Sequence, residues 1–103
     1  MLHPNFRAFQ LAVSFYAQCD RLKCAAHLKS QLLRAASSAV LNLSEGSACA
    51  SDADRKRFYN IAFASVREVQ AVLVLVPHAS AELIAASDSL GACVYRLCHS
   101  KRA

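Results

Sequence analysis

Apolar residues recur at helical spacing along this chain and divide it into four segments. The segments cover about residues 5–24, 25–45, 52–76 and 80–100, because positions three and four apart in sequence share one face of an α-helix. The connections between them are short, and short connections join antiparallel neighbours. The pattern therefore predicts an all-α fold, an up-down-up-down antiparallel four-helix bundle that forms a single domain over residues 1–103.

Residues at the predicted helix ends agree with this division. Ser51 or Asp52 suits the N-cap of the third helix, and the fourth is expected to start near Ser80, with Glu82 in its first turn. Pro77 ends the third helix, because a proline turns the residue before it away from helical geometry. Gly46 is predicted to end the second helix as a left-handed cap.

Three of the helices are apolar over more of their circumference than one bundle core requires. On the second helix, the face opposite the apolar arc is mostly small and uncharged, with Arg34 and Glu45 as its charged residues. The third helix is apolar over roughly 220° at 100° per residue, and the first is apolar most of the way round. Soluble monomers seldom expose such patches, so we expect a homo-oligomer packed through helix surfaces. The alternative is a tightly packed monomer with an unusually apolar exterior.

Two stretches of the sequence resemble motifs of a known family. RAASS at 34–38 followed by NLSEG at 42–46 is similar to an RRA-x-S-I-x-x-N-I-A-E-G signature, and RFYNIAFASVRE at 57–68 is similar to an F-x-x-I-A-x-G-S-x-x-E segment. FQLA at 9–12 is a weaker match to a W-Q-x-A pattern. These motifs are typical of four-helix bundle proteins that include the proteins encoded in intervening sequences of bacterial 23S ribosomal RNA genes.

The resemblance implies a bundle that assembles into a homopentameric ring and has no known enzymatic activity. A related group serves as accessory proteins to reverse transcriptases of diversity-generating retroelements, where a basic pentamer engages nucleic acid. The candidate partners are therefore further copies of this chain, RNA or DNA, and a reverse transcriptase or other nucleic-acid enzyme. The chain departs from the family pattern at Leu33, in place of the first arginine, and at Ala64, in place of a glycine.

Polar residues on the second and third helices form a candidate structural network: Arg34, Asn42, Glu45, Ser65 and Glu68. Arg34 and Asn42 lie on one stripe of the second helix, and Glu68 lies near the middle of the third. An arginine–carboxylate pair beside an asparagine satisfies buried polar groups and fixes helix register, whereas Glu45 is expected to cap or pair with the start of the third helix. The same residues could be interpreted as an active site, but nothing marks a nucleophile among them.

Positive charge gathers at one predicted end of the bundle. The net charge is +5 and the isoelectric point is about 9.2. The start of helix one, the turn between helices two and three and the C-terminus meet at this end, where seven cations against three acids account for +4 of that charge. These cations are the candidate nucleic-acid-binding residues, namely Arg7, Arg55, Lys56, Arg57, Arg96, Lys101 and Arg102.

In a ring of identical chains, the basic ends would line one face, and a phosphate backbone is the obvious partner for that face. Two alternatives remain open. The chain could be a protein–protein interaction scaffold whose basic end meets an acidic protein, or the cluster could serve solubility alone.

Little in the sequence indicates catalysis, a cofactor or a membrane. The chain has no Glu-x-x-His pair of the kind that binds di-iron in bundles, and its two glycines make no phosphate-binding loop. Its five cysteines are expected to be free thiols, because a metal site at Cys24 and His27 would lack a second ligand pair. No apolar run approaches the ~20 residues of a membrane span. We predict a cytoplasmic, non-enzymatic protein without metal or cofactor.

Overall fold

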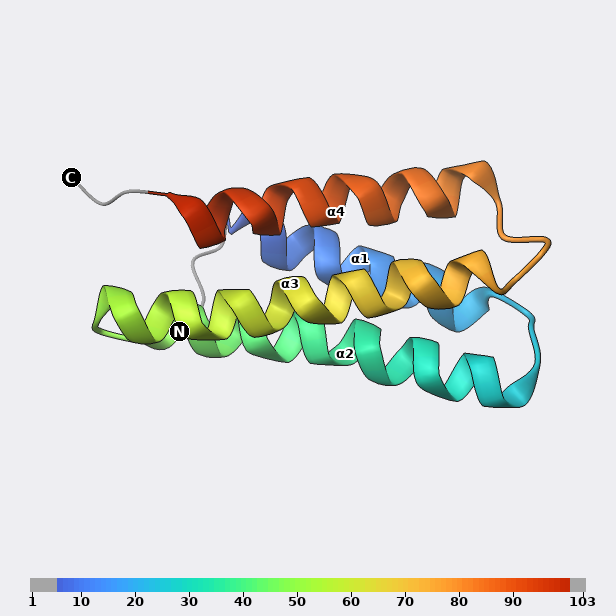
Figure 1. The fold of residues 1–103 in the computed structure, drawn as a ribbon, viewed down its shortest axis with the longest axis horizontal. Helices are drawn as coiled ribbons and strands as arrows, with labels where there is room; N and C mark the ends of the chain where they lie inside the picture. The colour runs from blue at the N-terminus through green and yellow to red at the C-terminus, as the bar shows by residue number, and fades with distance from the viewer. Residues whose placement is uncertain (1–5, 101–103) are drawn as a thin grey trace.

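The computed structural model describes residues 6–100, which form four helices in chain order. They are α1 (Arg7–Arg21), α2 (Ala26–Ala48), α3 (Asp52–Val74) and α4 (Ala81–His99). Successive helices run in opposite directions (Figure 1), and each helix packs against the next, while α4 also packs against α1. The predicted all-α, up-down-up-down four-helix bundle is therefore confirmed.

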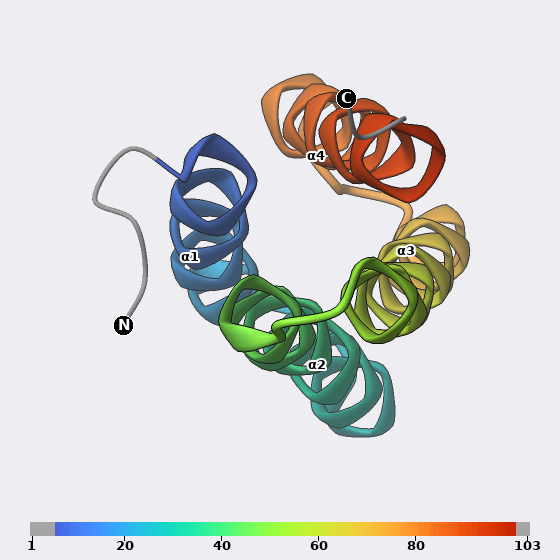
Figure 2. The same ribbon diagram turned by 90° about the vertical axis from the view of Figure 1, so that its left-hand side faces the viewer.

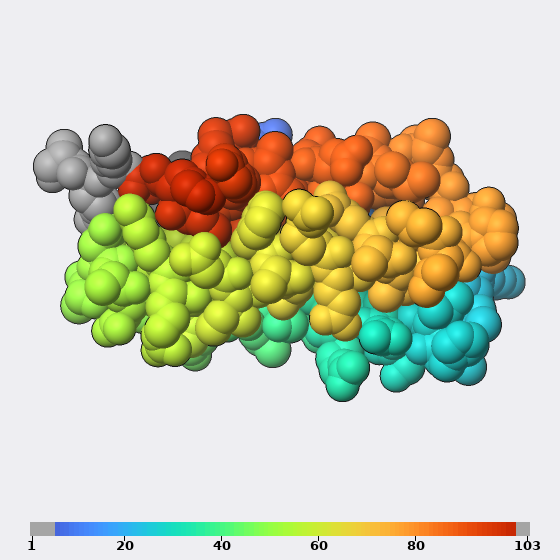
Figure 3. Space-filling model, in the orientation of Figure 1, coloured from blue at the N-terminus to red at the C-terminus, as the bar shows by residue number. Residues whose placement is uncertain are grey.

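The four helices surround one core, with α2 and α3 in the most extensive contact of any pair (Figure 2). Figure 3 shows the face on which α3 and α4 lie side by side. The core includes small residues such as Ala12 on α1 and Ala39 on α2. Larger side chains such as Phe15, Leu43 and Leu90 fill the space between the helices. Within residues 6–100, none of the helices combines the length and the hydropathy needed to cross a membrane.

The predicted N-cap of α3 is confirmed at Ser51, and α4 begins next to Ser80 as predicted, with Ser80 as its N-cap. The Ser51 hydroxyl accepts a hydrogen bond from the backbone N–H of Asp54 at 3.1 Å, and the Ser80 hydroxyl accepts one from the N–H of Leu83 at 3.1 Å. Each bond satisfies a backbone donor that the first helical turn leaves unpaired. Acidic side chains in both first turns add a favourable interaction with the helix dipole.

The predicted left-handed cap at Gly46 is wrong. The second helix continues through Gly46 to Ala48, and no glycine in the described residues has a positive φ. An added Cβ at Gly46 would lie 2.6 Å from Cε1 of Tyr59 and 3.2 Å from the carbonyl oxygen of Arg55. The glycine is therefore needed because α3 packs so closely on α2, and not because the backbone turns there.

The first helix is shorter than the predicted 5–24 at its C-terminal end. It ends at Arg21, and Leu22 already has an extended backbone with φ −70° and ψ 128°. The ammonium group of Lys29 donates to the carbonyl oxygen of Leu22 at 2.6 Å. This bond from α2 satisfies a carbonyl in the connection and stabilises the early end of α1. The predicted start at residue 5 lies outside the described residues.

Candidate nucleic-acid interface

The up-down topology brings the predicted basic residues toward one end of the bundle. The start of α1 and the end of α4 lie toward the end where α2 connects to α3 (Figure 1). We call this region the basic end and define it by the five predicted cations that the structure describes, Arg7, Arg55, Lys56, Arg57 and Arg96. Lys101 and Arg102 lie outside the described residues.

Two of these cations have partners at the start of α3 and in the connection before it. A guanidinium nitrogen of Arg55 donates to the carbonyl oxygen of Cys49 at 2.7 Å, and a second one lies 3.6 Å from a carboxylate oxygen of Asp52. The Lys56 ammonium lies 3.6 Å from the other oxygen of the same carboxylate. Both basic side chains are half-buried. Arg55 therefore holds the connection in place, and Asp52 offsets part of the positive charge of this pair.

The other three cations of the basic end are exposed. Arg7, Arg57 and Arg96 make no ion pair within residues 6–100. The guanidinium carbon of Arg57 lies 4.5 Å from the centroid of the Phe58 ring, a cation–π contact that orients the side chain while leaving its charge in solvent. Of the five described cations of the basic end, these three can meet a phosphate without first breaking an ion pair.

Within residues 6–100 of one chain, only Asn42 and Ser65 of the five predicted network residues are joined, through Ser38. The centre of this group is a hydrogen bond between the hydroxyls of Ser38 on α2 and Ser65 on α3, which are 2.9 Å apart. The Asn42 amide donates to the Ser38 carbonyl at 2.9 Å and to its hydroxyl at 3.2 Å. Ser65 also donates to the carbonyl of Ile61 at 3.1 Å. Ser65 is nearly buried, so this group links α2 to α3 in one register.

The charged members of the predicted network lie outside it. Arg34, Glu45 and Glu68 are exposed, and within residues 6–100 none of them makes an ion pair. The expected arginine–carboxylate pair is thus absent from the single chain, because Arg34 and Glu68 extend into solvent and the small serine hydroxyls fill the contact between α2 and α3. The backbone carbonyl oxygen of Glu45 accepts a hydrogen bond from the Cys49 thiol, with the sulfur and oxygen 3.3 Å apart. The Glu45 carboxylate makes no ion pair with the start of α3 within residues 6–100.

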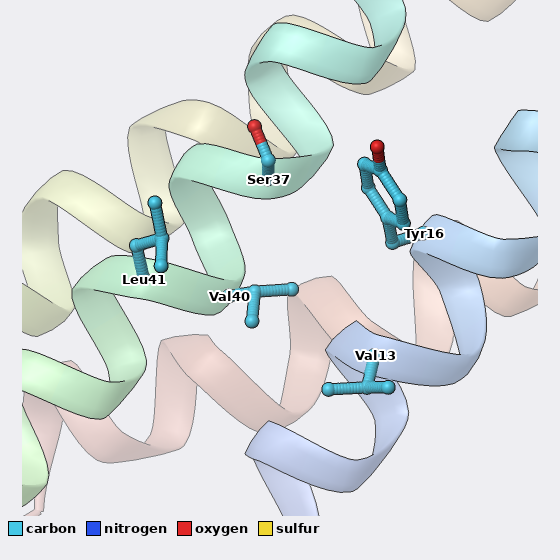
Figure 4. Close-up of a pocket in the computed structure, with 5 residues that line it drawn as sticks. All are labelled: Val13, Tyr16, Ser37, Val40 and Leu41. Carbon is cyan, nitrogen blue, oxygen red and sulfur yellow. The ribbon is translucent and has the colours of Figure 1, made fainter.

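An apolar groove follows the contact between α1 and α2 on the outside of the bundle (Figure 4). Val13 and Tyr16 of α1 face Ser37, Val40 and Leu41 of α2 across a hollow of about 200 Å³. Leu41 is 63% exposed and Val13 is 45% exposed. The groove is therefore an unpartnered apolar surface on two of the helices whose apolar arcs are too wide for one core.

Three of the five cysteines are small core residues. All five are free, and Cys19, Cys93 and Cys98 are buried. Burial raises the pKa of the Cys19 thiol to about 12, an effect that nearby Lys29 partly offsets, and burial also raises the pKa of Cys98. Both thiols therefore stay neutral near pH 7. In the described part of the chain, no three His, Cys, Asp or Glu side chains cluster in a way that could hold a metal ion.

Comparison with known protein families identifies the relationship that the two sequence motifs indicated. The family model described as 23S rRNA-intervening sequence protein matches residues 6–96. The chain belongs to this family. Searches among curated proteins and among solved structures returned no significant match. The matched residues include α1, α2 and α3 completely and most of α4, so the basic end and the apolar groove both lie on the part of the chain that defines a 23S rRNA-intervening sequence protein.

In this 23S rRNA-intervening sequence protein, the structure also brings together aromatic residues that the sequence analysis did not single out. Phe63 of α3 and Tyr95 of α4 have ring centroids 5.7 Å apart, and Tyr95 stacks on His99 with centroids 4.0 Å apart. The spacing of Tyr95 and His99, four residues apart on one helix face, is a signal that could have suggested the pair. The contact across helices to Phe63 requires the fold.

Proposed function

We propose that this family member is a non-enzymatic, homo-oligomeric helical bundle that binds nucleic acid through its basic end as an accessory factor. The pentameric ring that the family resemblance implies is the proposed assembly. The observation that carries the proposal is the exposure of Arg7, Arg57 and Arg96 at one end of the bundle, without ion-pair partners in the described residues. An assembly that places these ends on one face multiplies that charge by the number of chains.

Two features support self-association. The groove between α1 and α2 exposes Leu41 and Val13, and burial of apolar surface favours association. Arg34 and Glu68 are exposed and unpaired within the described chain, so a charge on one copy is available to pair with its opposite on a neighbour. We propose further copies of the chain as the partners of these surfaces.

The proposed interaction with nucleic acid is electrostatic and independent of sequence. When cationic side chains neutralise phosphates, condensed counterions are released into solution. The logarithm of the binding constant therefore falls linearly with the logarithm of the salt concentration, with a slope of about −0.7 to −0.9 for each phosphate contacted. Cations that are already exposed need no rearrangement to make such contacts. Removing one of them should weaken binding for every sequence alike and reduce the slope by about 1.

The test is fluorescence anisotropy with a labelled RNA of about 20 nucleotides at several salt concentrations from 50 to 200 mM, an interval over which phosphate-driven binding weakens strongly. We expect the double substitution Arg57→Ala, Arg96→Ala to weaken binding at least about tenfold at 50 mM salt and to flatten the salt dependence. The matched control is Arg21→Ala with Lys23→Ala, which removes two exposed cations at the opposite end of the bundle and should leave affinity within about twofold of the unmodified chain.

Absence of binding at 50 mM salt, or binding that salt does not change, would contradict the proposal. Equal losses in the two double variants would also contradict it, because they would show that net charge alone matters and the basic end does not. A partner protein that stays bound after nuclease treatment and is lost in the Arg57→Ala, Arg96→Ala variant would instead favour a protein–protein interaction scaffold.

A further inference from the structure

A ladder of aromatic and basic side chains crosses the seam between α3 and α4. Its members are Arg67 and Phe63 of α3, then Tyr95 and His99 of α4. The guanidinium carbon of Arg67 lies 6.0 Å from the Phe63 ring centroid, and Phe63 meets Tyr95 in a tilted contact at 60° between ring planes. Tyr95 and His99 are stacked at 30°. We call these four residues the aromatic ladder.

The ladder is accessible and its rings are held in place. Tyr95 is 50% exposed, and His99 and Arg67 are exposed as well. Nδ1 of His99 lies 2.9 Å from the Tyr95 carbonyl oxygen; because a carbonyl can only accept, Nδ1 carries the proton and the imidazole orientation is fixed. His99 remains exposed although one of its faces covers Tyr95, so a further planar ring can extend the stack.

A shallow groove lies beside the ladder. Its lining includes Phe63, Arg67 and Tyr95, with Gly91 and Ala92 as its small residues. The hollow measures about 230 Å³, which is below the roughly 300 Å³ at which pockets for drug-sized ligands begin. It therefore suits a single flat ring better than a whole cofactor. The acidic residue at its edge, Asp88, already accepts a hydrogen bond from Gln70 at 3.3 Å.

We infer that the aromatic ladder is a stacking platform for unpaired nucleotide bases, which makes the preferred ligand a single strand. The inference rests on the proposed function, because phosphates held at the basic end would bring the bases of a strand toward α4. Arg96 belongs to the basic end and directly follows Tyr95 in the chain, so the two sites lie on the same turn of α4, with these side chains about 100° apart around the helix axis. Bases within a duplex are already stacked on one another, and only unpaired bases can lie on a protein ring.

The chemistry of the ladder favours a base over a second copy of the chain. The groove between α1 and α2 offers mainly aliphatic side chains, as expected of a contact between copies. The ladder instead combines ring faces with the cation Arg67 and the imidazole of His99. Stacking on rings beside cationic side chains is the pattern by which proteins bind single strands without reading their sequence.

The test compares two labelled probes, a 12-nucleotide oligouridylate and an RNA duplex that carries the same number of phosphates. In the full chain, Tyr95→Leu keeps an apolar side chain but removes the ring, and Tyr95→Phe is the matched control that keeps the ring. We expect Tyr95→Leu to weaken oligouridylate binding about 5- to 100-fold while duplex binding changes less than about twofold. Tyr95→Phe should bind both probes as the unmodified chain does.

The outcomes separate this inference from the proposed function. If both probes lose affinity in the Arg57→Ala, Arg96→Ala variant but Tyr95→Leu changes neither, the basic end binds nucleic acid and the stacking platform is wrong. If Tyr95→Leu weakens both probes equally, or changes the mass of the assembly, the ladder supports the fold or the contact between copies and the inference is overturned. If the unmodified chain binds neither probe, the proposed function itself fails.

Discussion

Replacing Gly46 by alanine is expected to lower the free energy of unfolding by about 1–3 kcal/mol. The new methyl carbon would lie 2.6 Å and 2.8 Å from two carbons of the Tyr59 ring. The ring cannot move aside cheaply, because Tyr59 is buried and also packs against Phe6 with ring centroids 6.2 Å apart. This cost exceeds the gain of about 1 kcal/mol that alanine brings over glycine inside a helix. Thermal unfolding at one fixed protein concentration measures the change.

The matched control for this substitution is Gly91→Ala. Gly91 is also buried inside a helix, but an added Cβ there would meet its nearest side-chain atoms, in Gln70 and Val66, at 3.4 Å and 3.6 Å, which are ordinary contacts. We expect the control to be neutral or to stabilise the fold by up to about 1 kcal/mol. A Gly46→Ala protein as stable as the Gly91→Ala protein would show that α2 and α3 do not require the close approach described here.

Replacing Leu41 by aspartate is expected to split the assembly while leaving each chain folded. Leu41 is 63% exposed in the single chain, so its replacement removes little of the core. In the proposed assembly the groove between α1 and α2 is covered by a neighbouring copy, and each contact would then bury an unpaired carboxylate. Such a charge costs several kcal/mol, which corresponds to a dissociation constant raised by about 100-fold or more. Sedimentation velocity gives the mass distribution, and far-UV circular dichroism gives the helix content.

The control for Leu41→Asp adds the same charge elsewhere on the surface. Ser89 is exposed on α4, the helix that makes no contact with α2 in the described residues. We expect Ser89→Asp to leave the sedimentation profile unchanged. If Leu41→Asp also leaves it unchanged, the groove does not take part in self-association. If Leu41→Asp loses its helical signal, the loss of assembly follows from unfolding, and the groove has a structural role in the single chain.

The helices and their directions could be predicted from the sequence because local signals agree with the global fold. Ser51 and Ser80 are N-caps by virtue of their own hydroxyls, and a short connection determines that the next helix runs antiparallel. Gly46 shows where such reasoning ends. A glycine near the end of a helical pattern favours a cap locally, whereas its actual role depends on the Tyr59 ring of another helix. That contact exists only once α2 and α3 have packed.

For the candidate site, the sequence predicted which end of the bundle carries the positive charge, but it did not predict the partners of the individual cations. Topology brings the basic residues to one end, since alternate helices begin and end there. The sequence could not tell Arg55, which bonds to the Cys49 carbonyl, from Arg57, which stays exposed. That difference depends on the path of one connection. Periodicity already places Arg34 opposite the apolar arc of the second helix, and Arg34 and Glu68 are both exposed. Periodicity does not fix the direction of a long side chain, so it could not show that these two residues make no ion pair within residues 6–100.

The measurement that tests the central claim most directly is the mass of the unmodified chain by sedimentation equilibrium at micromolar concentration. The account requires self-association, because the chain exposes an apolar groove on α1 and α2 and further large apolar residues on α3 and α4. It predicts a stable particle of about five times the 11.2 kDa of one chain. A fully helical, stably folded particle of 11.2 kDa would contradict the assembly and, with it, the shared basic face.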